Sequence, residues 1–161
     1  MTQNQKGFTL IELMVVIAIL GILLGIGVPG MSMLLAQSRV SAAATDVQLA
    51  LQGARSVALS QRETYSVCAG TDQGEAACEN KNNWAQGWVT YKGGKTGVVT
   101  KVHALSGVDV STETPDFTYG PMGYLQPAIP QSIHISANGG QAERWVCVTA
   151  SGKVSVSRAS C

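Results

Sequence analysis

The chain has 161 residues, of which 45% are hydrophobic and 13% charged, and its 11 basic residues nearly balance its 10 acidic ones. This length allows one modest domain together with an anchor and leaves no room for several large domains. The balanced charge gives no indication of a polyanionic partner.

The first element is an apolar run from Phe8 to Val28, in which the only polar side chains are those of Thr9 and Glu12. Its length matches the roughly 20 residues that a helix needs to cross a bilayer, so we expect a transmembrane helix over residues 8–28. Lys6 is the only charged residue before the run. Its charge favours a cytoplasmic N-terminus and places everything after Val28 on the other side of the membrane.

Glu12 is the exception within this run. An ionised carboxylate in hydrocarbon costs about 2.5 to 3.5 kcal/mol on insertion scales, unless a partner or a shallow depth relieves it. Cleavage between Gly7 and Phe8 would create an α-amino group four residues before Glu12, which is one helical turn away. The same amine on a neighbouring copy is within reach as well, so we expect the acid to be matched by an amine in its own chain or in the next.

The segment Lys6-Gly7 followed by Phe8-Thr9-Leu10-Ile11-Glu12-Leu13 resembles the leader junction of type IV pilins and type II secretion pseudopilins. The resemblance implies that prepilin peptidase removes a leader of residues 1–7 and N-methylates Phe8. It also implies that Glu12 helps to dock the subunit into a helical filament. The partners implied are this peptidase, other minor pilins and the major pilin, with inner-membrane lipid around the helix before assembly.

Two other interpretations compete for the same segment. An ordinary secretory signal would have a more basic start, a shorter apolar region and a small-residue cleavage site. Ala42-Ala43-Ala44 resembles such a site but lies too far beyond the apolar run. A simple membrane anchor explains the hydrophobicity but leaves Gly7 and Glu12 without a role.

A second helical segment follows over residues 29–63. Pro29 and Gly30 interrupt the apolar run and predict a kink, since proline lacks a backbone donor and glycine adds flexibility. Beyond them, apolar residues recur at spacings of three and four, which predicts an amphipathic helix continuous with the first. This stripe consists of Val40, Ala44, Val47, Leu51, Ala54 and Ala58, while Arg39, Asp46, Gln52, Arg55 and Arg62 lie off it.

After Glu63 the apolar period changes to two, which is typical of strands. The expected strands are Tyr65 to Cys68, Gly87 to Tyr91, Val98 to Ala104, Phe117 to Tyr119, Ser132 to Ser136, Arg144 to Ala150 and Lys153 to Ser157. Glycine-bearing turns separate several of them. We therefore predict an α+β fold, in which a long N-terminal kinked helix packs on a C-terminal antiparallel sheet head over residues 64–161.

All four cysteines fall in this head: Cys68, Cys78, Cys147 and Cys161. An even count in an exported domain favours two disulfides, and the alternative of a zinc site lacks a C-x-x-C pair or clustered histidines. Three connectivities are possible. Local spacing favours Cys68 with Cys78 and Cys147 with Cys161.

Two segments of the head carry a further resemblance. The helix end Gln52-Gly53-Ala54-Arg55-Ser56-Val57-Ala58 leads into Tyr65-Ser66-Val67-Cys68, and Asn83-Trp84 precedes Gly87-Trp88-Val89-Thr90-Tyr91. Together they resemble the minor pilin group that contains the H pseudopilin of type II secretion (GspH) and the fimbrial T and U minor pilins (FimT, FimU). The resemblance implies a subunit that primes filament assembly or lies at the tip. A pilus subunit of the inner membrane with a periplasmic head is the expectation, and an H-type pseudopilin is the alternative. We expect Trp84 and Trp88 to be core aromatics, with a contact to another subunit as the alternative.

DNA binding is a further alternative that we do not favour. The T type carries a C-terminal Gly-Arg-x-Arg segment, and the matching place here is Gly152-Lys153-Val154-Ser155, followed by Arg158. Lysine and serine replace the two arginines, which weakens the phosphate contact. The candidate DNA-binding residues are Arg144, Lys153 and Arg158, and such binding needs them to be clustered.

The sequence gives little support for an enzyme. His103 and His134 lie on the polar sides of expected strands, where solvated histidines are common. Neither has a nucleophile or an acid at a spacing that requires a catalytic triad. We therefore predict no catalytic residue, no metal site and no cofactor.

Overall fold

The structure is a computed structural model of the chain. It describes residues 8–70, 84–93, 98–102, 105–137 and 139–161. The chain divides into two compact units, Met1–Leu35 and Ala36–Cys161, which are described separately.

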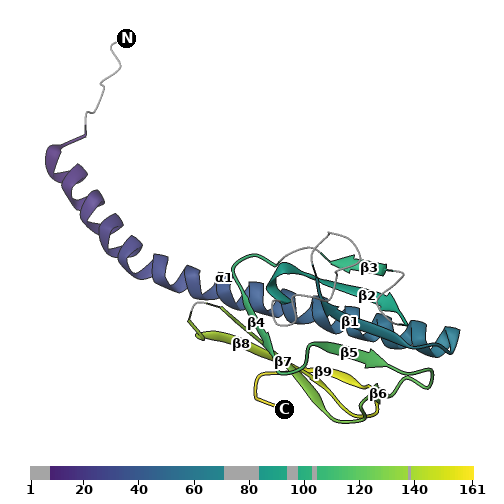
Figure 1. Cartoon of the computed structure of the whole chain (residues 1–161). Coiled ribbons are helices and arrows are strands. Elements are labelled where there is room, and N and C mark those ends of the chain that lie inside the picture. Colours follow the sequence, from purple (N-terminus) through teal and green to yellow (C-terminus); the bar gives the residue numbers. More distant parts are fainter. Residues whose placement is uncertain (1–7, 71–83, 94–97, 103–104, 138) are drawn as a thin grey trace. The chain divides into compact units, whose positions relative to one another are not determined.

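Helix α1 spans Leu10–Gln61, a length of 52 residues (Figure 1). Its backbone remains helical at Pro29 and Gly30, so the predicted continuous helix of about fifty residues is confirmed. Within the described part of the chain, α1 is the one helix long and apolar enough to cross a membrane.

The second unit contains the last half of α1 and two antiparallel sheets. The five-stranded sheet has the order β3-β2-β1-β5-β6, and the four-stranded sheet has the order β4-β7-β8-β9. The strands are β1 Tyr65–Ala69, β2 Trp88–Lys92, β3 Val98–Val102, β4 Asp109–Thr112, β5 Asp116–Tyr119, β6 Leu125–Gln126, β7 Gln131–Ala137, β8 Ala142–Val148 and β9 Val154–Ser157. A short 3-10 helix, η2, spans Trp84–Gln86 before β2.

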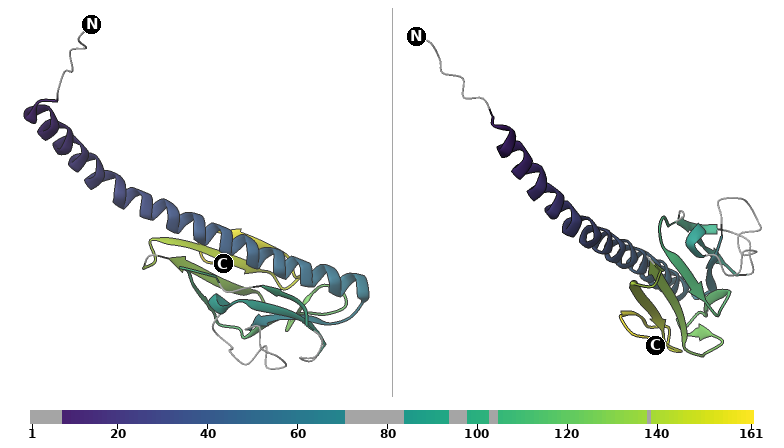
Figure 2. Two further views of the ribbon diagram at one scale, coloured as in Figure 1. Left: turned by 90° about the horizontal axis from the view of Figure 1, so that it is seen from above. Right: turned by 90° about the vertical axis from the view of Figure 1, so that its left-hand side faces the viewer.

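The second half of α1 lies along both sheets (Figure 2). The whole predicted stripe of the helix is buried there: Val40, Ala44, Val47, Leu51, Ala54 and Ala58. These side chains form one core with inward-facing residues of both sheets, including Phe117, Ile133 and Val146. The alanines of this stripe contribute only a methyl group each, which leaves room in the core for the larger side chains of the sheets, such as Phe117 and Ile133.

Trp84 and Trp88 belong to the same core, as predicted. Their ring centroids lie 6.2 Å apart, and Trp84 packs edge-on against Phe117 at 5.5 Å. This geometry is a favourable one for aromatic pairs. The two tryptophans therefore fix η2 against the five-stranded sheet, to which both β2 and β5 belong.

The predicted strands agree with the structure to within a few residues at their ends, except that Ala104 lies outside the described residues. Two strands were not predicted. Strand β4 is short and polar, and it exists because its residues pair with β7 from Asp109 opposite Ser136 to Thr112 opposite Ile133. Strand β6 has two residues that pair with the end of β5. Neither is long enough to show an alternating pattern.

Candidate functional site

Thr9 and Glu12 form the cap at the N-terminal end of α1. The Glu12 backbone N–H donates to Thr9 Oγ1 at 3.3 Å. Since the helix begins at Leu10, Thr9 is its N-cap residue and Glu12 is the third helical residue. Thr-x-x-Glu at these positions is the sequence of a capping box, and the Glu12 carboxylate also lies favourably at the positive end of the helix dipole.

Apolar side chains surround this acid along the first unit. Phe8 is 81% exposed, and the large side chains from Leu10 to Leu24 are all exposed. A contiguous exposed apolar surface of this kind is typical of segments that contact lipid or other protein chains. The one carboxylate in it lies in the first turn.

The other predicted N-terminal residues are placed as follows. Gly7 lies outside the described residues. Pro29 and Gly30 lie within α1, and a Cβ atom added to Gly30 would meet nothing within 4 Å. The kink at these residues and the leader boundary stay predictions.

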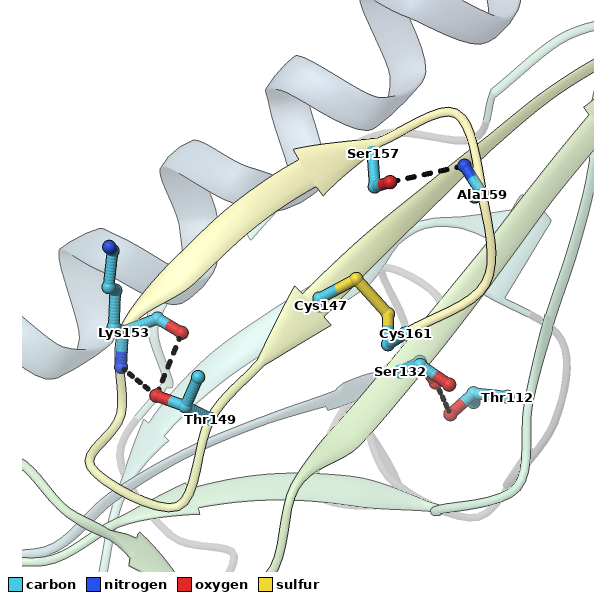
Figure 3. The surroundings of a disulfide bond; sticks show 8 residues. All are labelled: Thr112, Ser132, Cys147, Thr149, Lys153, Ser157, Ala159 and Cys161. Carbon is cyan, nitrogen blue, oxygen red and sulfur yellow. Dashed lines mark hydrogen bonds between the residues drawn. A yellow bond between two sulfur atoms is a disulfide. The ribbon is translucent and has the colours of Figure 1, made fainter.

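Cys147 and Cys161 form the expected disulfide, with their Cα atoms 5.7 Å apart. Figure 3 shows that the bond connects β8 to the C-terminal segment beyond β9. Cys68 is also disulfide-bonded, whereas Cys78 lies outside the described residues. The bond at Cys147 holds the last residues of the chain against the four-stranded sheet.

Arg55 occupies the junction between α1 and both sheets. Its Nε donates to the carbonyl oxygen of Gly123 at 3.0 Å, and its Nη2 donates to the carbonyl oxygen of Ser151 at 3.0 Å. Gly123 precedes β6 of one sheet, and Ser151 lies in the turn between β8 and β9 of the other. The sequence predicted only that Arg55 lies off the buried stripe, so this role was missed.

The three candidate DNA-binding residues are not brought together. In the register of β8 and β9, Trp145 pairs with Ser157 and Val148 pairs with Val154. Arg144 and Arg158 therefore lie at one end of the strand pair and Lys153 at the other, about 16 Å away at 3.3 Å per residue. The Lys153 backbone N–H donates to Thr149 Oγ1 at 3.1 Å, which holds the turn between β8 and β9 (Figure 3).

His134 lies on the outer face of the four-stranded sheet. Its Nε2 atom is 3.1 Å from Glu143 Oε2, and its side chain is only 26% exposed. Its ring lies 4.4 Å from that of Trp145, the residue directly opposite on β8. The sequence predicted a solvated histidine at this position, whereas the His134 side chain is partly buried. His103 lies outside the described residues, and no group of three potential metal ligands occurs in the described part of the chain.

Two tyrosines of the five-stranded sheet have a hydroxyl pKa above the ordinary value. Burial raises the pKa of Tyr119, and the Arg55 charge opposes this only in part. Burial also raises the pKa of Tyr91, against a hydrogen bond from Ser66 that lowers it. Both hydroxyls therefore stay neutral far above physiological pH, which suits core residues better than proton-transfer groups.

Two family models match the chain. The model described as the prokaryotic N-terminal methylation motif matches residues 2–28. The model described as type II transport protein GspH matches residues 43–152. The two matches cover the N-terminal run with Glu12 and most of the head.

Solved structures with a similar fold include the type IV minor pilin FimU of Pseudomonas aeruginosa. It has a TM-score of 0.61 and 20% sequence identity, over 74% of this chain and 89% of that one. The minor pseudopilin EpsH of the type 2 secretion system of Vibrio cholerae has a TM-score of 0.54 and 11% identity, over 74% of this chain and 96% of that one. At these identities the likeness shows the pilin fold.

Sequence relatives match a shorter stretch. A fimbrial protein of Pseudomonas aeruginosa is 44% identical over 62 residues, which is 38% of this chain and 40% of that protein. The type IV major pilin protein PilA of Myxococcus xanthus is 44% identical over 63 residues, 39% of this chain and 28% of that protein. The match thus spans less than half of the length of these relatives. Because the model for the head covers more than half of the chain, the protein belongs to the GspH family of pilin-like minor pilins and pseudopilins.

Proposed function

We propose that this protein is a minor type IV pilin that takes part in priming or tip assembly of a pilus. In this proposal prepilin peptidase cuts after Gly7 and methylates the new N-terminus at Phe8. The helix over residues 8–28 holds the precursor in the inner membrane, with the head in the periplasm. On assembly the apolar helix faces pack against neighbouring subunits in place of lipid.

The observation that carries this proposal is the single carboxylate in the first turn of α1, at the start of a helical stretch whose large apolar side chains from Leu10 to Leu24 are exposed. An acid in such a surface needs a cation when the surface is covered. The α-amino group of a processed Phe8, in the same or the next subunit, supplies that cation. The pair would then set the register between adjacent subunits, because it forms at one relative height only.

The Glu12 backbone takes part in the helix cap, and its side chain is the acidic residue of a capping-box sequence, so the test must separate capping from pairing. Glu12→Gln retains the capping-box residue type but removes the charge, whereas Thr9→Ala removes the cap and keeps the charge. We expect Glu12→Gln and Glu12→Val to insert into the membrane and to be lost from sheared filaments, while Thr9→Ala remains in them. Normal recovery of Glu12→Gln in filaments would contradict the pairing.

Processing is tested directly by mass spectrometry of the mature N-terminus. We expect a chain that begins at N-methylated Phe8, and we expect replacement of Gly7 by a bulkier residue to leave a longer precursor. A mature chain that begins elsewhere would overturn the proposal as a whole.

The second candidate is an H-type pseudopilin of a type II secretion system, supported by the description of the matching family model and by the fold of EpsH. Deletion of the protein distinguishes the two. Loss of surface pili with normal protein secretion supports the pilus subunit, and the reverse supports the pseudopilin. A DNA-uptake role is less supported, because Lys153 lies apart from Arg144 and Arg158.

A further inference from the structure

An exposed apolar patch lies where α1 ends. We call it the α1-end patch, and it consists of Leu59, Pro121, Met122 and Tyr124, with Arg62 at its edge; together these residues line a groove of about 630 Å³. Met122 is 77% exposed, Tyr124 55% and Leu59 46%. Contiguous apolar surface with a polar rim is typical of protein interaction sites, and Tyr, Met and Arg are enriched in them.

A second groove continues from Leu59 along the helix. It has a volume of about 360 Å³ and is lined by Gln52, Arg55, Ser56, Leu59, Lys153 and Val154. Among the described residues that line the two grooves, the charged ones are Arg55, Arg62 and Lys153, all of them basic. The apolar centre is therefore bordered by positive charge.

Arg62 adds an independent observation. Its φ is +55°, and in the described chain it is the one residue other than glycine with a positive φ. The Glu63 N–H donates to the Ala58 carbonyl oxygen at 3.3 Å, which makes Arg62 the left-handed residue of a helix-terminating Schellman motif. Glycine is the usual residue there, because a side chain is strained in that conformation. This outlier makes the exposed Arg62 side chain a candidate for a functional contact.

The patch is also held rigid by its backbone. The Gly123 N–H donates to the Gly120 carbonyl oxygen at 2.8 Å, and the Gly120 N–H donates to the Tyr124 carbonyl oxygen at 3.0 Å. This closed turn displays Pro121 and Met122, and Gly123 within it packs against Leu59 so closely that a Cβ would lie 2.9 Å from Leu59. A preformed surface loses little conformational entropy on binding.

We propose that the α1-end patch docks the head of a different pilin-type subunit, through an apolar side chain of that subunit flanked by carboxylates. The inference rests on the proposed function as a filament subunit. The apolar side chain would enter the groove between Leu59 and Met122, and the carboxylates would meet Arg62 at its edge and Lys153 in the adjoining second groove. Such rim charges select the partner and speed the encounter.

The same observations disfavour two other occupants. Two copies of this chain that met through the patch would bring Arg62 and Lys153 of each copy against like charges. DNA would need a cluster of basic groups free to contact phosphates, whereas Arg55 already binds two carbonyl groups and the centre of the patch is apolar.

The test uses the full-length protein in cells that assemble the filament, with the photocrosslinking amino acid p-benzoylphenylalanine at position 122. The same amino acid at Ser111, an exposed residue of β4 outside both grooves, is the control. We expect position 122 to form an adduct with another pilin-type subunit, identified by mass spectrometry from its peptides, and Ser111 to form none. Arg62→Glu should reduce the adduct about tenfold, since charge reversal at a rim combines lost attraction with repulsion. Arg62→Lys keeps the charge and should retain the adduct within about twofold.

Three results would overturn the proposal. They are an adduct that nuclease removes, an adduct between two copies of this chain, and no adduct at position 122 although the protein is present in sheared filaments. Absence of the unsubstituted protein from both pilus and pseudopilus filaments would instead refute the proposed function. The filament fraction therefore distinguishes failure of the patch from failure of the wider proposal.

Discussion

The Nε atom of Arg55 on helix α1 lies 3.0 Å from the carbonyl oxygen of Gly123, a residue 68 positions later in the chain. The Leu125 N–H donates to the Ala150 carbonyl oxygen at 3.1 Å beside it, so a backbone bond also links the two sheets at this point. A few polar contacts at the end of the core thus join the helix to the five-stranded sheet and to the four-stranded sheet. The α1-end patch lies directly over this junction.

Replacement of Arg55 by methionine removes both of its hydrogen bonds but keeps most of its apolar length. We expect the free energy of unfolding to fall by about 2 to 3 kcal/mol, because two carbonyl groups lose a charged donor at a partly buried site. The measurement is a urea titration of the full-length protein in mild detergent, followed by tryptophan fluorescence.

Arg158→Met is the matched control for that change, since Arg158 is exposed beyond the end of β9. Its effect should stay within about 0.5 kcal/mol. Equal losses in the two variants would contradict the role of Arg55 at the junction.

Gly152, in the turn between β8 and β9, lies close to the backbone of Gly123 at this junction. A Cβ atom there would lie 2.1 Å from the Gly123 carbonyl oxygen, and the φ of Gly152 is +79°. We expect Gly152→Ala to cost about 3 kcal/mol or more, because left-handed strain and a backbone clash add. The urea midpoint of the variant measures this cost.

A second glycine, Gly139, separates the cost of left-handed strain from the cost of the backbone clash. Its φ is +66°, but a Cβ atom there would meet nothing within 4 Å. Gly139→Ala should therefore cost only the conformational part, about 1 to 2 kcal/mol. If the two alanine variants were equally stable, the backbone clash at Gly152 would contribute nothing to the loss in stability.

The disulfide between Cys147 and Cys161 closes a loop with a sequence separation of 14. In the chain-entropy model a loop of that size stabilises the fold by about 3 kcal/mol. We expect the double variant Cys147→Ser with Cys161→Ser to lose about 2 to 3 kcal/mol in a urea titration and to keep its far-ultraviolet dichroism. Unchanged stability would mean that the C-terminal segment is held by other contacts.

Periodicity predicted the parts of the fold that bury apolar side chains. The stripe from Val40 to Ala58 recurs with the helical period, and all of its members are buried. From Ser132 to Ala137, the burial pattern of strand β7 follows the alternation of polar and apolar residues, whereas the polar Gln131 at its start is buried. In each case one physical effect, burial of one face, determines both the sequence pattern and the structure.

Features that depend on long-range partners were not predictable in this way. Strand β4 is defined by pairing with β7, and Arg55 by carbonyl groups far along the chain, which no local pattern encodes. The α1-end patch joins Leu59 to Met122 and Tyr124 and is visible only in the folded chain. The cap at Thr9 is different, because Thr-x-x-Glu is a local signal that the sequence did contain.

Tyr119 provides a prediction about pH. Its side chain is fully buried, and its hydroxyl has no hydrogen-bond partner among the described residues. Near pH 7 the phenol is neutral in both the folded and unfolded states. Tyr119→Phe should therefore change stability by no more than about 1 kcal/mol and in the stabilising direction, since it removes an unsatisfied buried hydroxyl.

Above pH 10 the folded and unfolded states of the unsubstituted protein differ. The unfolded chain releases the phenolic proton near its ordinary pKa of 10, whereas burial raises the pKa of Tyr119 in the folded state, so the folded protein keeps the proton. The unfolded state then binds fewer protons, and stability falls as pH rises, by up to about 1.4 kcal/mol per pH unit. Tyr119→Phe should remove this contribution and leave the smaller fall that the raised pKa of Tyr91 causes.

The measurement compares urea midpoints at about pH 7 and about pH 11, on either side of the ordinary tyrosine pKa. Tyr124→Phe is the control for loss of one hydroxyl, because Tyr124 is 55% exposed. The stability gap between Tyr119→Phe and the unsubstituted protein should widen with pH, in favour of the variant. A constant gap would mean that the Tyr119 hydroxyl ionises equally in the folded and unfolded states, and that water reaches it at the junction beneath Arg55.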